Sequence, residues 1–226
     1  MLQSCSVNSS ELSCKKLRIA VLASGSGSNF EALVNYCRRK DVLVATVCLL
    51  IVNNPGSGAE ARAERLGIPW ILINHRDFDN RELHDAAIAN TLKKENIDLV
   101  VLAGWMRIIT SELINAFPKG SLLNIHPSLL PAFKGSAAIA DALLAGVVKT
   151  GCTVHEVVLD VDAGPIMAQA EVLITKADDL ESLTAKIHQQ EHLILPPIVL
   201  AKARHLTQIM DKKVASANPA PEPIQS

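Results

Sequence analysis

Residues 17–29 read LRIAVLASGSGSN, and this stretch decides the fold class. Residues 17–23 form a continuous apolar run, which is typical of a β-strand that is covered on both faces in a parallel sheet. The glycine- and serine-rich residues 24–29 predict a tight turn, and residues 30–39 predict a helix. A buried strand that turns directly into a helix is the first half of a β-α-β unit.

The same alternation continues outward from this stretch. We expect strands over residues 42–52, 70–73, 98–103, 120–125, 152–159 and 167–175. We expect helices over residues 59–66, 77–94, 110–116, 134–145 and 178–195. Asp77 is a plausible cap for the second of these helices, and Gly67 closes the first. Together the elements predict an α/β protein: a Rossmann-like open, twisted, mainly parallel sheet with helices on both faces.

The chain has 226 residues, which is enough for one α/β domain with a buried core. We expect a single domain over residues 17–210, because no linker divides this part of the chain. Residues 1–16 are polar and serine-rich and predict a flexible extension. Residues 211–226 are rich in Pro and Ala and predict a disordered tail.

Charge and cysteine content exclude several classes of protein. Twenty-two Lys and Arg oppose 23 Asp and Glu, and this balance argues against a broad nucleic-acid surface or a polybasic membrane anchor. The five cysteines form no CxxC pair, so neither a disulfide framework nor a zinc site is expected. The N-terminus lacks the apolar stretch of a signal peptide. We therefore expect a cytoplasmic protein.

The turn after the first strand is a candidate phosphate site. Glycines allow the backbone to approach an anion closely, and the amides at the start of the next helix then point at that anion. Gly27, Ser28 and Asn29 stand at this point. The pattern is neither a P-loop nor the full dinucleotide fingerprint. The alternative is a tight strand-to-helix turn without a ligand.

Asn124 and His126 form a candidate reaction centre. They are two residues apart at the end of a predicted strand, so their side chains point to one face. An Asn and a His side by side can polarise a carbonyl and stabilise an oxyanion. Asp162, before a Gly-Pro turn, could orient the imidazole, or it could simply make hydrogen bonds within the turn. His155, taken alone, is interpreted as a core residue.

Six motifs together resemble the phosphoribosylglycinamide formyltransferase family. They are ASGSGSN (23–29), LAGWMRI (102–108), NIHPSLLP (124–131), GCTVH (151–155), VDAGPI (161–166) and QQEH (189–192). The resemblance covers residues 17–201 and implies the formyltransferase fold, in which later strands extend a Rossmann-like sheet. Ser136, Ala137 and Ala138 depart from the pattern, because many relatives carry a His near the start of this helix.

The resemblance implies an enzyme that transfers the formyl group of 10-formyltetrahydrofolate, as co-substrate, to the amine of 5-phosphoribosylglycinamide in purine biosynthesis. The matched catalytic residues are Asn124, His126 and Asp162. The residues matched to the phosphoribosylglycinamide pocket are Gly27, Ser28, Asn29, Gln189, Gln190 and Glu191. The residues matched to the folate pocket are Arg81, Met106, Arg107, Ile108, Ile109, Val158, Leu159, Asp160 and Val161.

The implied reaction is a direct attack through a tetrahedral intermediate, without a metal or a covalent enzyme intermediate. Small molecules are the expected partners, with no nucleic acid or membrane, and the protein is expected to be a monomer or homodimer. Methionyl-tRNA formyltransferase and formyltetrahydrofolate deformylase share the Asn-x-His and Asp pattern, but each carries an additional domain that we do not expect here. A binding module with a decayed active site is the alternative from another class.

Overall fold

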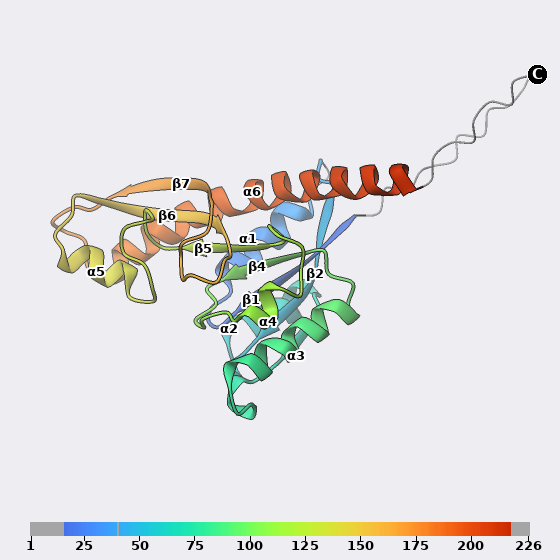
Figure 1. The fold of residues 1–226 in the computed structure, drawn as a ribbon. Coiled ribbons are helices and arrows are strands. Elements are labelled where there is room, and N and C mark those ends of the chain that lie inside the picture. The colour runs from blue at the N-terminus through green and yellow to red at the C-terminus, as the bar shows by residue number, and fades with distance from the viewer. Residues whose placement is uncertain (1–15, 40, 218–226) are drawn as a thin grey trace, which may run out of the picture.

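One seven-stranded sheet forms the centre of the fold. Helices pack against both of its faces (Figure 1). The computed structural model describes residues 16–39 and 41–217. The strands are β1 (Leu17–Ala23), β2 (Ala45–Val52), β3 (Trp70–Leu72), β4 (Leu99–Ala103), β5 (Leu122–His126), β6 (Lys149–Glu156) and β7 (Ile166–Leu173). The helices are α1 (Ser28–Cys37), α2 (Gly58–Leu66), the short 3-10 helix η1 (His75–Asp77), α3 (Arg81–Lys94), α4 (Ser111–Ile114), α5 (Ala138–Leu144) and α6 (Leu180–Ala217).

The sheet has the strand order β3-β2-β1-β4-β5-β6-β7. Strands β1 to β5 pair in parallel, whereas β6 pairs antiparallel with β5 and β7 pairs antiparallel with β6. The predicted α/β fold with a mainly parallel sheet is therefore confirmed. The two antiparallel strands extend the sheet beyond its Rossmann-like half.

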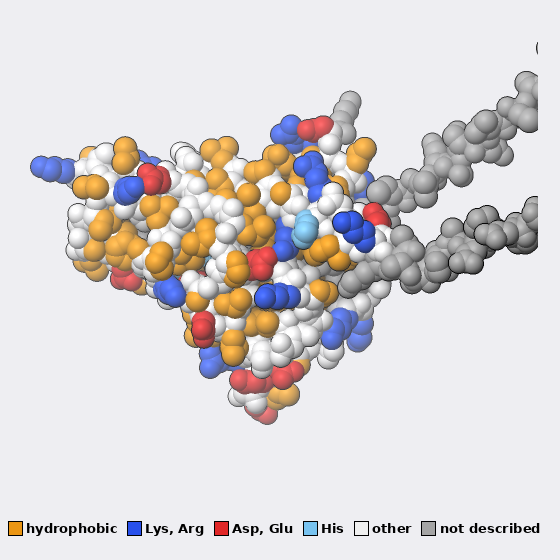
Figure 2. Space-filling view, turned by 45° about the horizontal axis from the view of Figure 1, so that its top comes forward, with side chains coloured by type: hydrophobic (Ala, Val, Ile, Leu, Met, Phe, Trp, Pro, Cys, Tyr) orange, Lys and Arg blue, Asp and Glu red, His pale blue; other side chains and the backbone are white. Residues whose placement is uncertain are grey.

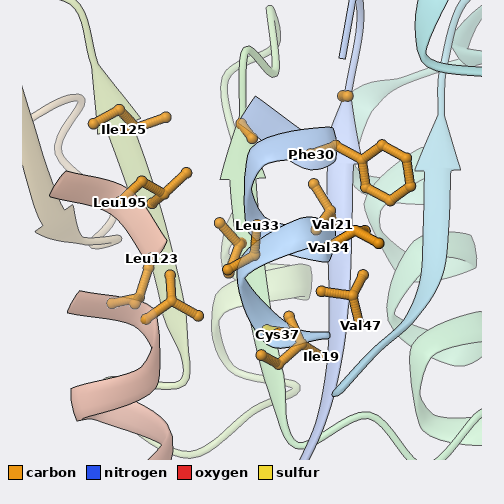
Figure 3. Packing of buried hydrophobic residues seen from close by; sticks show 14 of the residues in the cluster. Ile19, Val21, Phe30, Leu33, Val34, Cys37, Val47, Leu123, Ile125 and Leu195 are labelled. Carbon is orange, nitrogen blue, oxygen red and sulfur yellow. The ribbon is translucent and has the colours of Figure 1, made fainter. Parts of the chain in front are cut away.

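One face of the sheet packs against α1, α2 and α6. Alternate residues of a strand point to opposite faces, so Ile19 and Val21 of β1 point to this side. They are buried with Phe30 and Leu33 of α1 and with Leu195 of α6 (Figure 3). Apolar side chains from the sheet, α1 and α6 thus fill one continuous core.

The opposite face packs against α3 and α4. Ala20 and Leu22 of β1 point to this side and are buried with Ile88 and Leu92 of α3 and with Leu113 of α4. Because β1 is buried on both faces, its apolar run is continuous rather than alternating. This is the physical reason why the opening stretch of sequence identified the fold class.

The last helix extends well past the expected end at residue 195. It contains Pro196 and Pro197, which remove two backbone donors from the helix interior. The apolar spacing continues beyond them, because Val199, Leu200 and Ala203 are buried in the same core. That burial favours a continued helix over a break at the prolines. The helix runs through residues 211–217 of the expected tail, while residues 1–15 and 218–226 of the two expected flexible ends lie outside the described residues.

Several other boundaries differ from the sequence prediction by one to four residues; β2, for example, begins at Ala45 instead of residue 42, and α5 begins at Ala138 instead of residue 134. Asn80, not Asp77, caps α3, since its side chain accepts a hydrogen bond from the Leu83 N–H at 2.8 Å. Asp77 instead ends the short helix η1. The strand expected over residues 152–159 is β6, which begins at Lys149 and ends at Glu156, the last residue paired with β5. Residues 157–159 belong instead to the loop between β6 and β7.

The outer surface carries both signs of charge. On the face shown in Figure 2, Lys and Arg side chains are interspersed with Asp and Glu side chains among the described residues. Within those residues, no helix combines the length and apolar character that crossing a membrane requires. No group of three or more His, Cys, Asp or Glu side chains is arranged to hold a metal ion in the same part of the chain.

Packing of α6 beyond its proline pair can be tested by substitution. Leu200 is 2% exposed, whereas Leu193, one turn before the prolines, is 66% exposed. We expect Leu200→Ala to lower the free energy of unfolding by about 2–5 kcal/mol, because it removes buried methyl groups and leaves a cavity. We expect Leu193→Ala, the matched control, to change it by no more than about 0.5 kcal/mol. Equal effects in chemical denaturation would contradict the observed packing.

Candidate active site

A cleft of about 850 Å³ opens at the carboxyl ends of β1, β4 and β5. Open α/β sheets bind their ligands at this edge. The cleft is lined by residues from the stretches 24–29, 102–109, 124–127, 135–140 and 155–162, and by one face of α6. It therefore brings together all six regions that carried the sequence motifs.

The loop between β1 and α1 forms one wall. Gly27 has a φ of 75°, and a Cβ at this position would lie 2.7 Å from the Cα and Cβ of Ala59. Glycine is required here for the backbone conformation and for the close approach of α2. Ser28 begins α1, so the unpartnered N–H groups of the first helical turn stand at the wall of the cleft.

A buried pair connects this loop to α6. The Asn29 Nδ2 donates a hydrogen bond to Glu191 Oε2 at 2.7 Å. Burial raises the pKa of Glu191 to about 7, although the hydrogen bond from Asn29 lowers it in part. The Oδ1 of Asn29 is buried and has no hydrogen-bond partner among the described residues, which leaves it available to a donor on a ligand.

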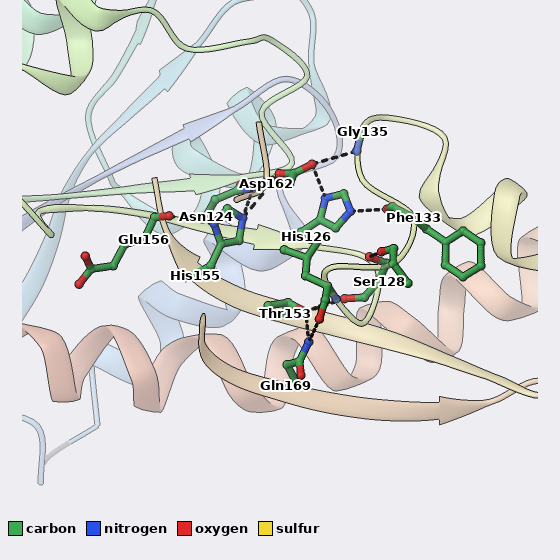
Figure 4. A network of polar contacts seen from close by, with 12 residues as sticks. Asn124, His126, Ser128, Phe133, Gly135, Thr153, His155, Glu156, Asp162 and Gln169 are labelled. Atoms are coloured by element: carbon green, nitrogen blue, oxygen red, sulfur yellow. Dashed lines mark hydrogen bonds and ion pairs between the residues drawn. The ribbon is translucent and has the colours of Figure 1, made fainter. Parts of the chain in front are cut away.

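Asn124, His126, His155 and Asp162 form a polar cluster in the same cleft (Figure 4). The His126 Nδ1 lies 3.4 Å from Asp162 Oδ2, and the His126 Nε2 donates to the Phe133 carbonyl at 2.8 Å. Both ring nitrogens thus face oxygen atoms, and the carboxylate of Asp162 stands on the Nδ1 side of the ring.

Asn124 is held by His155 and Asp162. Its Nδ2 lies 3.1 Å from His155 Nε2 and 3.5 Å from Asp162 Oδ1. The His155 Nδ1 lies 2.9 Å from the Glu156 carbonyl oxygen, and its Nε2 also lies 3.6 Å from Asp162 Oδ1, so the ring contacts both Asn124 and Asp162. His155 is 3% exposed and orients the amide that faces the cleft.

The loop between β6 and β7 folds Asp162 back onto the two histidines. Its base is closed by a hydrogen bond from the Glu156 N–H to the Pro165 carbonyl at 3.0 Å. A Cβ on Gly164 would overlap the Glu156 carbonyl, so only glycine allows this closure. Asp162 itself has a φ of 49°, a left-handed conformation that is costly for most side chains and tolerated by Asp.

The environment of Asp162 favours its ionised form. Burial alone raises the pKa of a carboxyl group, but here the His155 ring, the Gly135 N–H at 2.9 Å and the charge of His126 outweigh it. The pKa of Asp162 is therefore lowered from its usual range. A carboxylate is the state needed to hold a protonated imidazole.

Two apolar segments form the remaining walls. Met106 and Ile108 are 67% and 52% exposed, and Leu159 and Val161 stand in the loop after β6. Large apolar side chains left exposed in a cleft, next to a few polar groups, are typical of a site for a flat organic ligand. Of the other residues matched to the folate pocket, the cleft is also lined by Arg107, Ile109 and Val158.

Four of the matched residues do not line the cleft. Asp160 is exposed on the loop after β6, and Arg81 is exposed at the first position of α3. Gln189 is exposed and Gln190 is half-buried on α6, where the cleft is lined instead by Leu180, Thr184, His188 and Glu191. These positions follow the three- and four-residue spacing of one helix face.

His155 and His188 are site residues that sequence reasoning missed. The helical spacing from Glu191 would have identified His188, whose pKa is lowered by burial. His155 lies opposite Asn124 in the antiparallel register of β6 and β5. That register depends on which strands pair, so spacing alone could not place His155 beside Asn124, although its motif GCTVH belongs to the family resemblance.

Comparison with known proteins agrees with this geometry. The family model described as formyl transferase matches residues 17–199. The chain therefore belongs to the formyl transferase family.

The relatives specify the branch of the family. The chain is 39% identical to the phosphoribosylglycinamide formyltransferase of Bacillus subtilis (strain 168), over 80% of this chain and 92% of that protein. It is 42% identical to the trifunctional purine biosynthetic protein adenosine-3 of Drosophila melanogaster, over 91% of this chain. The chain spans only 14% to 20% of the length of the trifunctional relatives that it matches.

Solved structures agree with the sequence relatives. The glycinamide ribonucleotide transformylase 1 of Symbiobacterium toebii has a TM-score of 0.81 at 39% identity, covering 84% of this chain and 89% of that one. The corresponding protein of Geobacillus kaustophilus has a TM-score of 0.78 at 42% identity, covering 83% and 98%. The resemblance to phosphoribosylglycinamide formyltransferase, and with it the formyltransferase fold, is confirmed.

The tight approach at Gly27 leads to a stability prediction. Alanine at either Gly27 or Gly56 is forced into a left-handed conformation, but Gly56 has no neighbouring atom within 4 Å of an added Cβ. We expect Gly56→Ala to lower the free energy of unfolding by about 1–2 kcal/mol through backbone strain alone. Gly27→Ala should cost at least about 1 kcal/mol more, because it also collides with Ala59. Equal losses in urea denaturation would show that the loop relaxes freely.

The raised pKa of Glu191 predicts how stability depends on pH. The folded chain holds this proton more tightly than the unfolded chain, so deprotonation opposes folding as the pH rises through about 7. We expect the unfolding free energy of wild type to fall relative to that of Glu191→Gln between about pH 5 and pH 8. Because every other titrating group is present in both proteins, the difference between their unfolding free energies reports the titration of Glu191 alone. A difference that is the same at both pH values would contradict the buried, weakly acidic state of Glu191.

Proposed function

We propose that this chain transfers the formyl group of 10-formyltetrahydrofolate to the amine of 5-phosphoribosylglycinamide in de novo purine biosynthesis. The observation that carries the proposal is the single cleft, which joins an anion-binding helix start, an apolar wall and the Asn124–His126–Asp162 cluster. Family membership and the names of the relatives support the same reaction.

The phosphoribosyl group is proposed to bind between α1 and α6. The phosphate takes the N–H groups around Gly27, Ser28 and Asn29, because a helix start attracts anions. Glu191 accepts hydrogen bonds from the ribose hydroxyls, with His188 on the same helix face as a further polar contact. The glycinamide arm then extends along the cleft toward Asn124.

The folate is proposed to lie between the two apolar segments. Met106 and Ile108 contact one face of its ring system, and Val158, Leu159 and Val161 contact the other. Backbone groups of the same segments supply the polar contacts to the ring edges. Because Arg81 and Asp160 are exposed outside the lining, they are suited only to parts of the folate that extend beyond the cleft.

The chemistry follows from the polar cluster. The glycinamide nitrogen attacks the formyl carbon, a carbon–nitrogen bond forms, and the formyl oxygen becomes an oxyanion. Asn124 and protonated His126 donate hydrogen bonds to that oxygen, which stabilises the tetrahedral intermediate. Asp162 keeps His126 charged and oriented.

Collapse of the intermediate releases the folate. The bond between the formyl carbon and the folate nitrogen breaks, the folate nitrogen takes up a proton, and the attacking nitrogen loses one through His126 or an ordered water. No covalent enzyme intermediate is needed. The His126 Nε2 must exchange its bond with the Phe133 carbonyl for one with the substrate, so the loop after β5 has to adjust when ligands bind.

A spectrophotometric assay tests the function. Protein is mixed with a 10-formyl folate and 5-phosphoribosylglycinamide, and the absorbance of the deformylated folate is followed with time. Signal that requires the ribonucleotide supports formyl transfer. Signal without the ribonucleotide would point instead to a deformylase, and a folded protein without signal in either mixture would point to a binding module.

The catalytic assignment gives a mutational prediction. Removing one oxyanion donor typically costs about 2.7–4 kcal/mol of transition-state stabilisation. We therefore expect Asn124→Ala and His126→Ala each to lower kcat about 100-fold or more. His205→Ala, at an exposed position of α6 outside the cleft, is the matched control and should keep the wild-type kcat. A kcat within a few-fold of wild type for either cleft variant would refute its assigned role.

A further inference from the structure

The segment from Gly104 to Thr110 connects β4 to α4 without regular secondary structure. It carries the exposed Met106 and Ile108 into the cleft, and it forms one wall of the proposed folate pocket. An irregular segment that displays large apolar side chains in the absence of a ligand needs supports outside itself. The hydrogen bonds of the structure place those supports at its two ends.

The first end is fixed by Ser24, the residue after β1. The Ser24 N–H donates to the Gly104 carbonyl at 3.0 Å, and the Ser24 Oγ accepts from the Met106 N–H at 2.9 Å. Ser24 is 8% exposed and belongs to the same cleft. This end of the segment is thus tied to the phosphate-binding loop.

The second end is fixed by a buried carboxylate from another element. The Asp85 Oδ2, on α3, accepts a hydrogen bond from the Thr110 N–H at 2.6 Å. Asp85 is 1% exposed and does not line the cleft, so it cannot touch a ligand bound there. Helix α3 lies beside α4 on the face of the sheet opposite α6 (Figure 1). A short charge-assisted bond of this kind holds its donor more firmly than a neutral one.

His84 completes the support. Its Nε2 donates to the Ile73 carbonyl at 3.0 Å, and its Nδ1 lies 3.5 Å from Asp85 Oδ1. The ring is fully buried and stacks on Trp105, with 6.1 Å between ring centroids and 7° between planes. Trp105 itself lines the cleft. One buried His-Asp pair therefore holds the segment both through its backbone and through its aromatic side chain.

We infer that Asp85 is a positioning residue for the folate-binding segment, acting through the Thr110 N–H, and that His84 positions Trp105 beside it. The inference rests on the proposed function. According to the inference, the affinity for the folate donor depends on Asp85 and His84, although neither residue contacts a substrate. The phosphoribosyl pocket uses a different set of residues around Asn29 and Glu191, so its affinity does not depend on Asp85.

The test compares two aspartates that make the same kind of bond. Asp98 accepts the Arg18 N–H at 2.8 Å at the amino end of β4, away from the cleft. Asp85→Ala should weaken binding of tetrahydrofolate, measured by calorimetry, about tenfold or more. It should raise the KM for the formyl donor by a similar factor. The KM for the ribonucleotide should stay within twofold of wild type. Asp98→Ala should leave both affinities unchanged, although it loses a similar hydrogen bond.

A conservative variant separates positioning from folding. Asp85→Asn keeps an oxygen for the Thr110 N–H, so we expect it to recover most of the tetrahydrofolate affinity that Asp85→Ala loses. If Asp85→Ala does not fold, Asp85→Asn should still show a loss of about threefold, confined to the folate, because its bond lacks the charge. Folded Asp85 variants that all bind tetrahydrofolate as wild type does would overturn the inference. Failure of wild type to bind tetrahydrofolate would overturn the proposed function instead.

Discussion

The contact between Asp162 and His126 is the interaction on which the rest of the site depends. It joins the carboxyl end of a parallel strand to a loop that leaves an antiparallel one, across a sequence separation of 36 residues. The loop reaches back only because Gly164 permits closure at Glu156 and because Asp162 adopts a left-handed backbone. The antiparallel extension of the sheet thus brings Asp162 to the edge where His126 ends its strand, and this contact creates the proposed reaction centre. Without it, His126 would end a strand with only the Phe133 carbonyl as partner.

The two halves of the cleft differ in how they are stabilised. The side proposed to bind the phosphoribosyl group is built from regular elements, with a helix start facing a helix, and its central contact is the buried Asn29–Glu191 pair. The side proposed to bind the folate is built from irregular segments that expose apolar side chains and are held by polar groups beneath them. Regular elements are suited to a small rigid anion. Adjustable loops over a fixed support are suited to a larger, flat co-substrate.

Much of this molecule could be predicted from sequence, because the strongest signals were local. The continuous apolar run of β1 and the glycine-rich turn after it identified the α/β fold and one wall of the cleft. The residues alone offered the pairing of Asp162 with His126 as one of two alternatives, and the family resemblance decided between them. The position of His155 opposite Asn124 depends on the register between β5 and β6. Helix α6 continues through Pro196 because buried residues follow it. Tertiary packing, which no local pattern contains, decided each of these features.

Following the formyl carbon itself tests the central claim most directly. Wild-type protein would be incubated with 10-formyltetrahydrofolate labelled with ¹³C in the formyl group, with and without 5-phosphoribosylglycinamide, and the label would be followed by NMR. The account predicts that the label appears as a formamide on the glycinamide nitrogen, and only when the ribonucleotide is present. Label released as free formate at the same rate with or without the ribonucleotide, or label that stays on the folate, would contradict it.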